Sequence, residues 1–286
     1  ARSLASPVLR TVGVLFRRQR STIDANDLDY VDGVRRALEP SGIQVVIPIV
    51  KSSAPLIELR SLVRSGALGG VVLMDVAQGD EREAMLLKEG IPTVLIGSSG
   101  SSSGAPGVDT DFGQMARAAV DHLAGLGHRR VVALMRETSQ DDSHARQDQA
   151  RELLRAAGAL AVDVLVRQVP ELALAGGDIV GADGLVDGRT AVISNNPAAL
   201  VGLACAAQAH GLSIPADLSV LTLGVTEYRG RHGEAFSELS VDREAMGEAV
   251  GSLLLTRLRR EPAPVEHRTL MSAVLTDHGS TARCRD

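Results

Sequence analysis

The sequence is poor in aromatic side chains: its 286 residues include no Trp, two Tyr and three Phe. A surface that stacks flat ligands or nucleic-acid bases on aromatic rings therefore has almost nothing to use. The core must instead be built from Leu, Val, Ala and Ile, and an apolar fraction of 44% is large enough for that. Charged residues make up 23% of the chain, which is typical of a folded domain and argues against disorder.

Cysteine and basic residues are also limited. Cys205 and Cys284 form neither a CxxC pair nor a disulfide framework, which favours a reducing compartment. The net charge of −5 gives no sign of the clustered Lys and Arg that binding to duplex DNA needs. No apolar run reaches membrane-spanning length and no signal-peptide pattern is present, so we expect a cytoplasmic protein with no membrane partner.

What the sequence does contain is a regular alternation of short apolar runs and longer segments of helical periodicity. This alternation predicts parallel strands covered by helices on both faces of a sheet. There are too many strand–helix units for one open sheet, so we expect two doubly wound α/β lobes with a break near Gly127. The expected strands are 11–16, 43–50, 70–74, 93–96, 130–135, 162–169, 190–193, 219–223 and 269–275, and the expected helices are 27–38, 54–65, 80–89, 113–126, 143–157, 197–210 and 243–260.

Motifs of enzymes and metal sites are matched only in weak form. The GxSxG match at 100–104 lies in a Gly/Ser-rich loop, whereas a nucleophile elbow needs a strand, a sharp turn and an immediate helix. The cluster at 141–144 contains Asp, Ser and His, but catalytic triads are assembled in space, and a helix cap is the more common use. The glycines at 66–70 precede a strand, which argues against a nicotinamide cofactor. We therefore expect no catalytic residue, no metal and no cofactor.

Two further polar features have structural uses. Asp109 and Asp111 form a DxD motif that could hold a divalent cation, but Asp111 also precedes the expected helix 113–126, and we favour a helix cap. His128 lies between a helix and a strand, where it can close the turn. The seven His residues show no spacing typical of metal ligands.

Ligands of doubly wound sheets bind beyond the carboxyl ends of the strands, so side chains at these positions are candidates. Arg17 begins an arginine cluster after the first strand, which is either an anion site or a solvated loop. Arg146 opposes a helix dipole, so either a ligand or a pair with Asp142 could compensate its charge. Asn195 follows the strand 190–193 and can present its amide to a ligand, cap the next helix, or do both.

Several segments together resemble the LacI/GalR family of bacterial transcription regulators. Their order and spacing extend the resemblance over essentially the whole chain. The stretch HLAGLGHRRVVAL is similar to the most recognisable segment of that family. The matching segments are ARSLA (1–5), HLAGLGHRRVVAL (122–134), ISNNPAALVGL (193–203), GLSIPADLSVLTLG (211–224), VDREAMGEAV (241–250) and GST (279–281).

The resemblance implies a periplasmic-binding-protein-like type I fold, an α/β architecture of two Rossmann-like doubly wound lobes joined by three crossovers. On this model the N-terminal lobe spans 8–126 plus 241–260, and the C-terminal lobe spans 127–236 plus 266–286. Residues 1–7 would be a hinge-helix remnant, in which Leu4, beside Ala1, is the wedge for the DNA minor groove. The helix-turn-helix headpiece of the family is absent from these 286 residues.

The resemblance also assigns residues to an effector site. Arg146 and Asn195 align with the ligand-binding Arg and Asn of the family. The strand ends add four weaker effector-binding candidates, which are Asp75, Ser98, Arg17 and Phe16.

Two departures from the family pattern concern carboxylates. Gly97 stands where sugar-binding members often place an Asp, and Gly224 and Val225 stand where they usually place Asp-Asp. These departures argue against a typical hexose. The expected effector is therefore a small polar molecule in a wider sense, namely a sugar, a phosphosugar or a small acid.

The sequence therefore predicts the effector-sensing and dimerisation domain of a LacI-type DNA-binding transcriptional regulator, of the repressor kind. A ligand between the lobes would close them, shift the first lobes of a homodimer and change the fit of the hinge helices to operator DNA. The alternative is a sugar-type solute-binding protein of a transport system with the same fold. The missing export signal, the hinge remnant and the cysteine pattern argue against this alternative.

Overall fold

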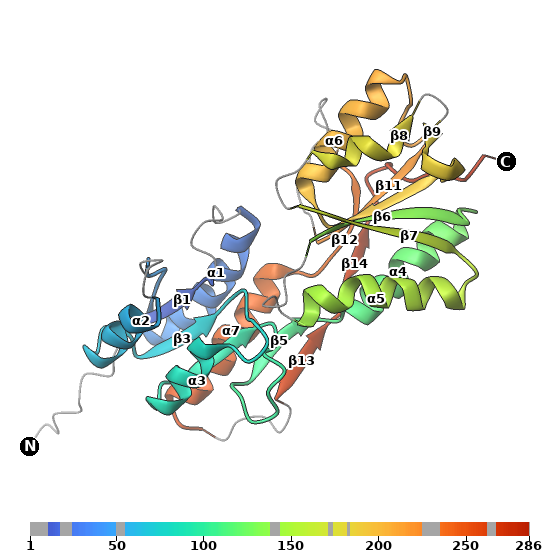
Figure 1. The fold of residues 1–286 in the computed structure, drawn as a ribbon. Coiled ribbons are helices and arrows are strands. Elements are labelled where there is room, and N and C mark those ends of the chain that lie inside the picture. The colour runs from blue at the N-terminus through green and yellow to red at the C-terminus, as the bar shows by residue number, and fades with distance from the viewer. Residues whose placement is uncertain are drawn as a thin grey trace, which may run out of the picture. The chain divides into compact units, whose positions relative to one another are not determined.

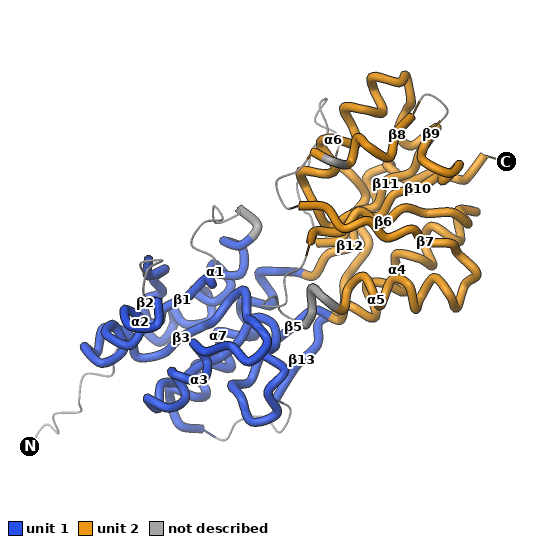
Figure 2. Tube along the Cα trace, viewed as in Figure 1, with its two compact units in different colours: residues 1–110, 141–145, 242–271 blue, residues 111–140, 146–241, 272–286 orange. Residues whose placement is uncertain are grey.

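The computed structural model describes residues 11–17, 25–49, 55–137, 144–170, 174–181, 184–224, 235–261 and 267–285. The chain divides into two compact units (Figures 1 and 2). Unit 1 comprises residues 1–110, 141–145 and 242–271, and unit 2 comprises residues 111–140, 146–241 and 272–286. Apart from the short segment 141–145, which groups with unit 1, the chain passes between the units after Thr110, Val241 and Met271.

Unit 1 is built on a six-stranded sheet with the order β13-β5-β4-β3-β1-β2, in which every neighbouring pair is parallel. Helices α1, α2, α3 and α7 accompany this sheet. The elements are β1 (Thr11–Leu15), α1 (Ala25–Leu38), η1 (Glu39–Ser41), β2 (Gln44–Val46), α2 (Pro55–Arg64), β3 (Gly70–Leu73), α3 (Glu81–Lys88), β4 (Thr93–Ile96), β5 (Gly107–Thr110), α7 (Arg243–Leu258) and β13 (Arg268–Met271).

Alternating strand residues cover both faces of this sheet, as a doubly wound fold requires. Val71 and Leu73 of β3 belong to a buried cluster with Leu59 of α2 and Leu86 of α3. Gly70 points to the other face, because a Cβ placed there would lie 3.3 Å from side chains of α7. The continuous apolar strands predicted from the sequence are therefore buried between two layers of helices.

Helices α1 and α7 pack against each other through glycines. A Cβ at Gly247 would overlap the Tyr30 carbonyl oxygen and lie 3.0 Å from the Cα of Gly33. A Cβ at Gly33 would overlap the Glu244 carbonyl oxygen in turn. The two backbones therefore approach so closely that this crossing tolerates no side chain.

Unit 2 contains a second six-stranded sheet, with the order β14-β12-β11-β10-β6-β7. Its pairs are parallel except for β12 and β14, which are antiparallel. The elements are α4 (Phe112–Gly125), β6 (Arg130–Arg136), α5 (His144–Ala159), β7 (Asp163–Val169), η2 (Ala175–Ile179), β8 (Val180–Gly181), β9 (Gly184–Leu185), η3 (Val186–Gly188), β10 (Ala191–Ser194), α6 (Pro197–Ala209), β11 (Ser219–Leu223), β12 (Ser237–Ser240) and β14 (Val274–Thr276).

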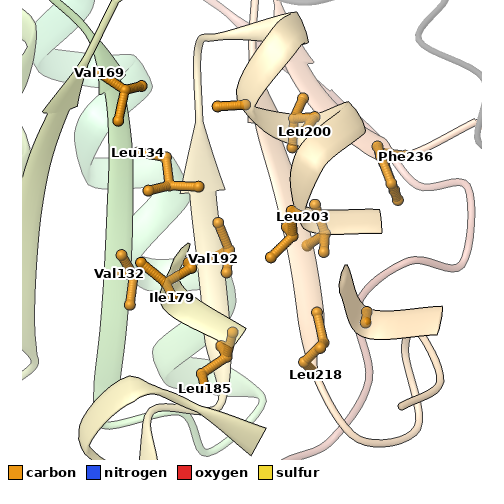
Figure 3. Close-up of a cluster of buried hydrophobic side chains, with 13 residues drawn as sticks. Val132, Leu134, Val169, Ile179, Leu185, Val192, Leu200, Leu203, Leu218 and Phe236 are labelled. Atoms are coloured by element: carbon orange, nitrogen blue, oxygen red, sulfur yellow. The ribbon is translucent and has the colours of Figure 1, made fainter. Parts of the chain in front are cut away.

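Aliphatic side chains build the core on one face of this sheet, as the shortage of aromatic residues requires (Figure 3). Val132 and Val192 of neighbouring strands pack with Leu200 and Leu203 of α6, and all four side chains are fully buried. Phe236 is the one aromatic member of this cluster. Helices α4 and α5 lie on the other side of the sheet (Figure 1). Unit 2 is therefore doubly wound like unit 1.

Asp and Asn side chains begin four of the helices. Asp80, Asp111 and Asp242 each accept a hydrogen bond from a backbone N–H in the first turn of the helix that follows, and Asn196 accepts two. The predicted cap at Asp111 is thereby confirmed, with a distance of 2.8 Å to the N–H of Gln114.

The structure corrects several details of the predicted layout. The expected strand 269–275 is two strands, β13 in unit 1 and β14 in unit 2, because the chain passes between the units after Met271. Strands β5 and β12 were not expected. Helix α4 groups with unit 2, whereas the lobe boundaries expected from the sequence put it in the first lobe. Its Gln114 side chain exchanges hydrogen bonds with the backbone of Ala273, which belongs to the same unit.

His128 lies at the amino edge of the unit 2 sheet and is buried. Its Nδ1 is 2.7 Å from Thr190 Oγ1, and its Nε2 is 3.0 Å from both Ser219 Oγ and the carbonyl oxygen of Ala282. One imidazole thus joins the starts of three strands to the C-terminal segment. This is more than the turn closure expected from the sequence.

The same C-terminal segment is fixed at further points. The Ser280 hydroxyl donates to the carbonyl of Val220 and accepts from the N–H of Ser237 at 2.7 Å. Arg189 links the starts of β6 and β7. Its guanidinium donates to the carbonyl oxygens of Val131 and Asp163, both at 2.9 Å. The amino edge of unit 2 is therefore closed by the protein's own side chains.

The glycine crossing leads to a stability prediction. Gly247→Ala is expected to lower the free energy of unfolding by about 1–3 kcal/mol, because the backbones of α1 and α7 must move apart. Gly158→Ala on α5 is the matched control, since a Cβ there meets nothing within 4 Å. This control is expected to be neutral or stabilising. Urea unfolding followed by circular dichroism measures both, and equal midpoints for the two variants would contradict the close approach.

His128 leads to a prediction on pH. Burial lowers the pKa of His128, with a smaller opposing effect from the bond to Ala282, so the native state resists protonation. As pH falls from 7.5 to 5.5, the unfolded chain with its His pKa of about 6.5 takes up the proton first, and stability decreases. His128→Gln, which cannot titrate, is expected to reduce the slope of unfolding free energy against pH. The largest possible contribution of one group is about 1.4 kcal/mol per pH unit.

Ser280→Ala is the control for this experiment, because it removes hydrogen bonds that fix the same C-terminal segment without removing a titrating group. It is expected to lower stability at every pH and to keep the wild-type slope. Burial also lowers the pKa of His122, partly opposed by Asp277, so some slope remains in His128→Gln. A slope in His128→Gln that equals the wild-type slope would rule out this role of His128.

Candidate functional site

Each sheet has one point where the strand order reverses, and this point is where doubly wound folds bind ligands. In unit 1 the reversal lies between β1 and β3, because β2 is on the far side of β1. In unit 2 it lies between β6 and β10, because β7 is on the far side of β6. The carboxyl ends of each pair of strands therefore define a candidate binding edge in each unit.

Asn195 lies at the reversal point of unit 2, directly after β10. Its Oδ1 accepts a hydrogen bond from the N–H of Arg136, the last residue of β6, at 2.7 Å. Its Nδ2 donates to Oε1 of Gln149 on α5 at 2.6 Å. The two bonds fix the orientation of the amide across the two central strands. The neighbouring Asn196, and not Asn195, caps α6.

Gln149 is the buried partner that orients Asn195. It is 5% exposed, and its own Nε2 reaches only the Met115 sulfur, at 3.7 Å. Arg146 lies three residues earlier on the same helix. The Arg146 side chain lies outside the described residues, and so does its possible partner Asp142.

The four candidates of unit 1 lie after three neighbouring strands. Phe16 and Arg17 follow β1, Asp75 follows β3, and Ser98 follows β4; all four are partly exposed. Because these strands are parallel neighbours, the four residues lie along the same edge of the sheet. The Ser98 hydroxyl accepts a hydrogen bond from the N–H of Gly100 at 3.2 Å.

Asp75 has an unusual backbone conformation at this edge. Its φ of 49° lies in the left-handed region, which is uncommon for residues other than Gly. Such conformations persist where the surrounding structure enforces them, and they gather at functional sites. The conformation therefore supports Asp75 as a site residue on grounds that the sequence does not offer.

An ion pair at the same edge is not among the candidates that the sequence offers. Arg82 of α3 contacts Asp80 at 2.7 Å, and the two side chains are 11% and 4% exposed. The Arg82 guanidinium also donates to the carbonyl oxygens of Leu15 at 3.3 Å, Met74 at 2.9 Å and Asp75 at 3.3 Å. Burial alone would raise the pKa of Asp80, but hydrogen bonds from Arg82 and Ala77 bring it below its ordinary value.

The two glycines that replace family carboxylates also lie at carboxyl ends. Gly97 has a φ of 107° and Gly224 a φ of 64°, both in the left-handed region. Their N–H groups donate to Val108 and Leu239 of the adjacent strands at 2.8 Å. Glycine adopts this conformation without strain, so both positions form relaxed turns at the ends of their strands.

Asp109 of the DxD motif has a structural partner. Arg268 of β13 lies 2.5 Å from Asp109, and Asp109 also accepts from the N–H of Thr110. Burial raises the pKa of Asp109, and Arg268 opposes this rise. With Asp111 used as a cap, neither carboxylate is arranged for a cation. In the part of the chain that the structure describes, no three His, Cys, Asp or Glu side chains come together as a metal site.

The GxSxG match does not form a nucleophile elbow. Residues 100–104 form turns, and the next element is the strand β5 instead of a helix. The Ala105 N–H that follows donates to the buried carboxylate of Glu83 at 2.6 Å. Among the described helices, none has both the length and the apolar character needed to cross a bilayer. Ala1, Leu4 and Val225 lie outside the described residues.

Comparisons with known proteins identify the family. The model of the periplasmic binding protein-like domain matches residues 120–281, more than half of the chain. An uncharacterized HTH-type transcriptional regulator in the aml 5′ region of Streptomyces limosus is 28% identical over 171 residues, which cover 57% of this chain and 49% of that protein. The chain thus matches about half the length of this curated relative.

Two solved structures show the same fold. A LacI family transcriptional regulator from Bifidobacterium animalis subsp. lactis has a TM-score of 0.82 at 17% identity, and the match covers 97% of this chain and 99% of that chain. A complex of the transcriptional regulator CelR with cellobiose has a TM-score of 0.78 at 21% identity, covering 95% and 84%. The chain therefore belongs to the periplasmic binding protein-like domain family.

Proposed function

We propose that this chain is the effector-sensing and dimerisation part of a LacI-type transcriptional repressor. A small polar molecule binds at the carboxyl edge of the sheets, and its binding changes how a DNA-binding segment outside these 286 residues holds operator DNA. The chain acts by binding and not as an enzyme. It works in the cytoplasm, where its DNA is.

The observation that carries this proposal is the Asn195 amide. It follows β10 at the strand-order reversal of unit 2 and is fixed by the Arg136 N–H and by Gln149. In the described part of the chain, these are its two partners, so one N–H of its NH₂ group remains for a ligand. A rigid amide at this topological position suits the recognition of a polar molecule.

The effector is a sugar, a phosphosugar or a small acid. The structural neighbour in complex with cellobiose supports a carbohydrate. The glycines at 97 and 224 leave fewer carboxylates at the edge than a typical hexose site uses, which favours an unusual sugar or a sugar derivative. Arg146, three residues before Gln149 on α5, adds a cation for a phosphoryl or carboxylate group.

A binding screen tests the effector proposal. Cellobiose, glucose, glucose 6-phosphate, gluconate and citrate are each added in a thermal-shift assay. At least one is expected to raise the melting temperature, because a ligand at 100 times its Kd adds about 2.7 kcal/mol of stability. Asn195→Ala is expected to weaken binding about tenfold, measured by calorimetry, because it removes the amide.

Gln208→Ala is the control, since Gln208 is an exposed amide in the last turn of α6, at the end of that helix far from Asn195. It is expected to bind as the wild type does. The same ligand is expected to change the affinity of the longer, headpiece-containing protein for DNA from its own promoter. A ligand that binds Asn195→Ala as tightly as the wild type would show that the site lies elsewhere.

The homodimer is proposed on a different observation. Strand β2 is an edge strand of unit 1, and apolar side chains follow it into solvent: Ile49 is 93% exposed and Ile57 of α2 is 70% exposed. Exposed edges with apolar neighbours are typical of surfaces that pair with another chain. A second copy of this chain is the partner expected for a regulator of this family.

Sedimentation velocity tests the dimer. The wild-type chain is expected to sediment as a dimer at micromolar concentration, and the double variant Ile49→Asp, Ile57→Asp as a monomer with unchanged circular dichroism. Leu174→Asp is the control, because Leu174 is 62% exposed in unit 2. It is expected to remain dimeric. A monomeric wild type, or a double variant that still forms dimers, would count against this interface.

A further inference from the structure

The Arg82 side chain makes contacts at the carboxyl edge of unit 1 that the capping of α3 does not require. The cap of α3 needs only Asp80 and the N–H groups of the first turn, and the Arg82 N–H supplies one of these bonds at 2.9 Å. The guanidinium reaches further, to carbonyl oxygens at the ends of both β1 and β3. These are the two strands that flank the reversal point, so a single side chain fixes their ends relative to each other.

The contact with Asp75 is the part of this arrangement that concerns binding. Arg82 Nη2 donates to the Asp75 carbonyl oxygen, whose direction depends on the backbone angles of Asp75. Asp80 holds the guanidinium in turn, through two contacts at 2.7 and 3.0 Å. Arg82, held by Asp80, is therefore placed to support the left-handed conformation of Asp75 through its carbonyl oxygen.

Asp75 places a carboxylate at the end of β3, whereas the end of the neighbouring strand β4 has none at Gly97. Because β3 and β4 are parallel neighbours, both residues lie at the same edge of unit 1. A carboxylate accepts hydrogen bonds and repels anions, so it recognises hydroxyl groups and not a bare acid.

We propose that Arg82 is a positioning residue of the effector site, which holds Asp75 in its left-handed conformation so that the Asp75 carboxylate accepts hydrogen bonds from the hydroxyl groups of a polyhydroxylated effector. This inference rests on the proposed function and narrows its ligand class. It ranks sugars and sugar derivatives above small acids without hydroxyl chains.

Three changes separate binding from folding. Asp75→Gly removes the carboxylate and keeps a residue that accepts positive φ. The double variant Asp80→Asn, Arg82→Gln removes the hold on Asp75 without leaving a buried unpaired charge. The matched control is Arg64→Gln, Glu89→Gln, which neutralises another ion pair of unit 1, at 2.9 Å, with the Arg64 side chain 66% exposed.

Binding of cellobiose, glucose, glucose 6-phosphate, gluconate and citrate is measured by calorimetry at 20 °C, with circular dichroism to verify folding. The wild type is expected to bind a probe that carries several hydroxyl groups. Asp75→Gly and the Asp80/Arg82 double variant are expected to weaken this binding about tenfold or more. The Arg64/Glu89 control is expected to bind like the wild type.

A comparison of melting temperatures distinguishes the positioning role from a purely structural role of Arg82 in this loop. Asp75→Ala is expected to melt below Asp75→Gly, because Ala is strained at positive φ. This difference is expected to shrink when Asp80→Asn and Arg82→Gln are added, since the hydrogen bond from Arg82 to the carbonyl oxygen of residue 75 is then lost. An unchanged difference would overturn the positioning role.

The outcomes also distinguish the two proposals. Binding of a hydroxyl-rich probe that is unaffected by Asp75→Gly and by the double variant overturns the inference and leaves the proposed function in place. Binding of citrate alone does the same, because it contradicts the ligand class. If no probe binds the wild type, both the inference and the effector proposal fail.

Discussion

At both ends of the strands of a parallel sheet, some backbone N–H and C=O groups have no hydrogen-bond partner within the sheet. Where these groups are buried, other parts of the folded chain must supply the partners. In unit 2 this constraint is met at the amino edge by His128, Arg189 and the C-terminal segment. At the carboxyl edge, the Arg136 N–H donates to Asn195, the Ser194 hydroxyl donates to the carbonyl of Leu134, and the Asn196 amide donates to the carbonyl of Pro170. Side chains of the protein therefore satisfy backbone groups at both edges, and Asn195 is the one among them that we propose also contacts a ligand.

Unit 1 satisfies its carboxyl edge in a different way. The carbonyl groups of Leu15 and Met74 are paired with Arg82, which Asp80 neutralises. Recognition at this edge then depends on side chains placed by the loops, above all on Asp75. The two units share one topology, yet one offers an amide and the other a carboxylate.

The sequence predicts most of the fold because buried parallel strands are continuous apolar runs. Strands such as Thr93–Ile96 and Ser219–Leu223 have the predicted bounds. Strand β12 was missed because its residues, Ser237–Ser240, are mostly polar, and β5 was missed because it follows a Gly/Ser-rich loop. The division of 269–275 between two sheets depends on tertiary pairing, which hydrophobic pattern does not encode.

The candidate site was less predictable for a related reason. Topology and family resemblance point to Asn195 and Asp75, but periodicity treats Arg82 as an ordinary polar residue in the first turn of a helix. Its role depends on a hydrogen bond to the carbonyl oxygen of Leu15, which lies 67 positions earlier in the chain. The one local signal is the pair Asp80 and Arg82, directly after a strand and a turn, which is also common in surface helices.

The order in which unit 1 is assembled has a consequence for synthesis on the ribosome. Helix α1 is made early, but its glycine face is completed only by α7, more than 200 residues later, and the last strand of the same sheet, β13, is made later still. The apolar surfaces of unit 1 that α7 and β13 later cover therefore stay exposed while the segment from β6 to β12 is translated. We expect unit 1 to complete its fold only after α7 and β13 have left the ribosome, late in the synthesis of these 286 residues.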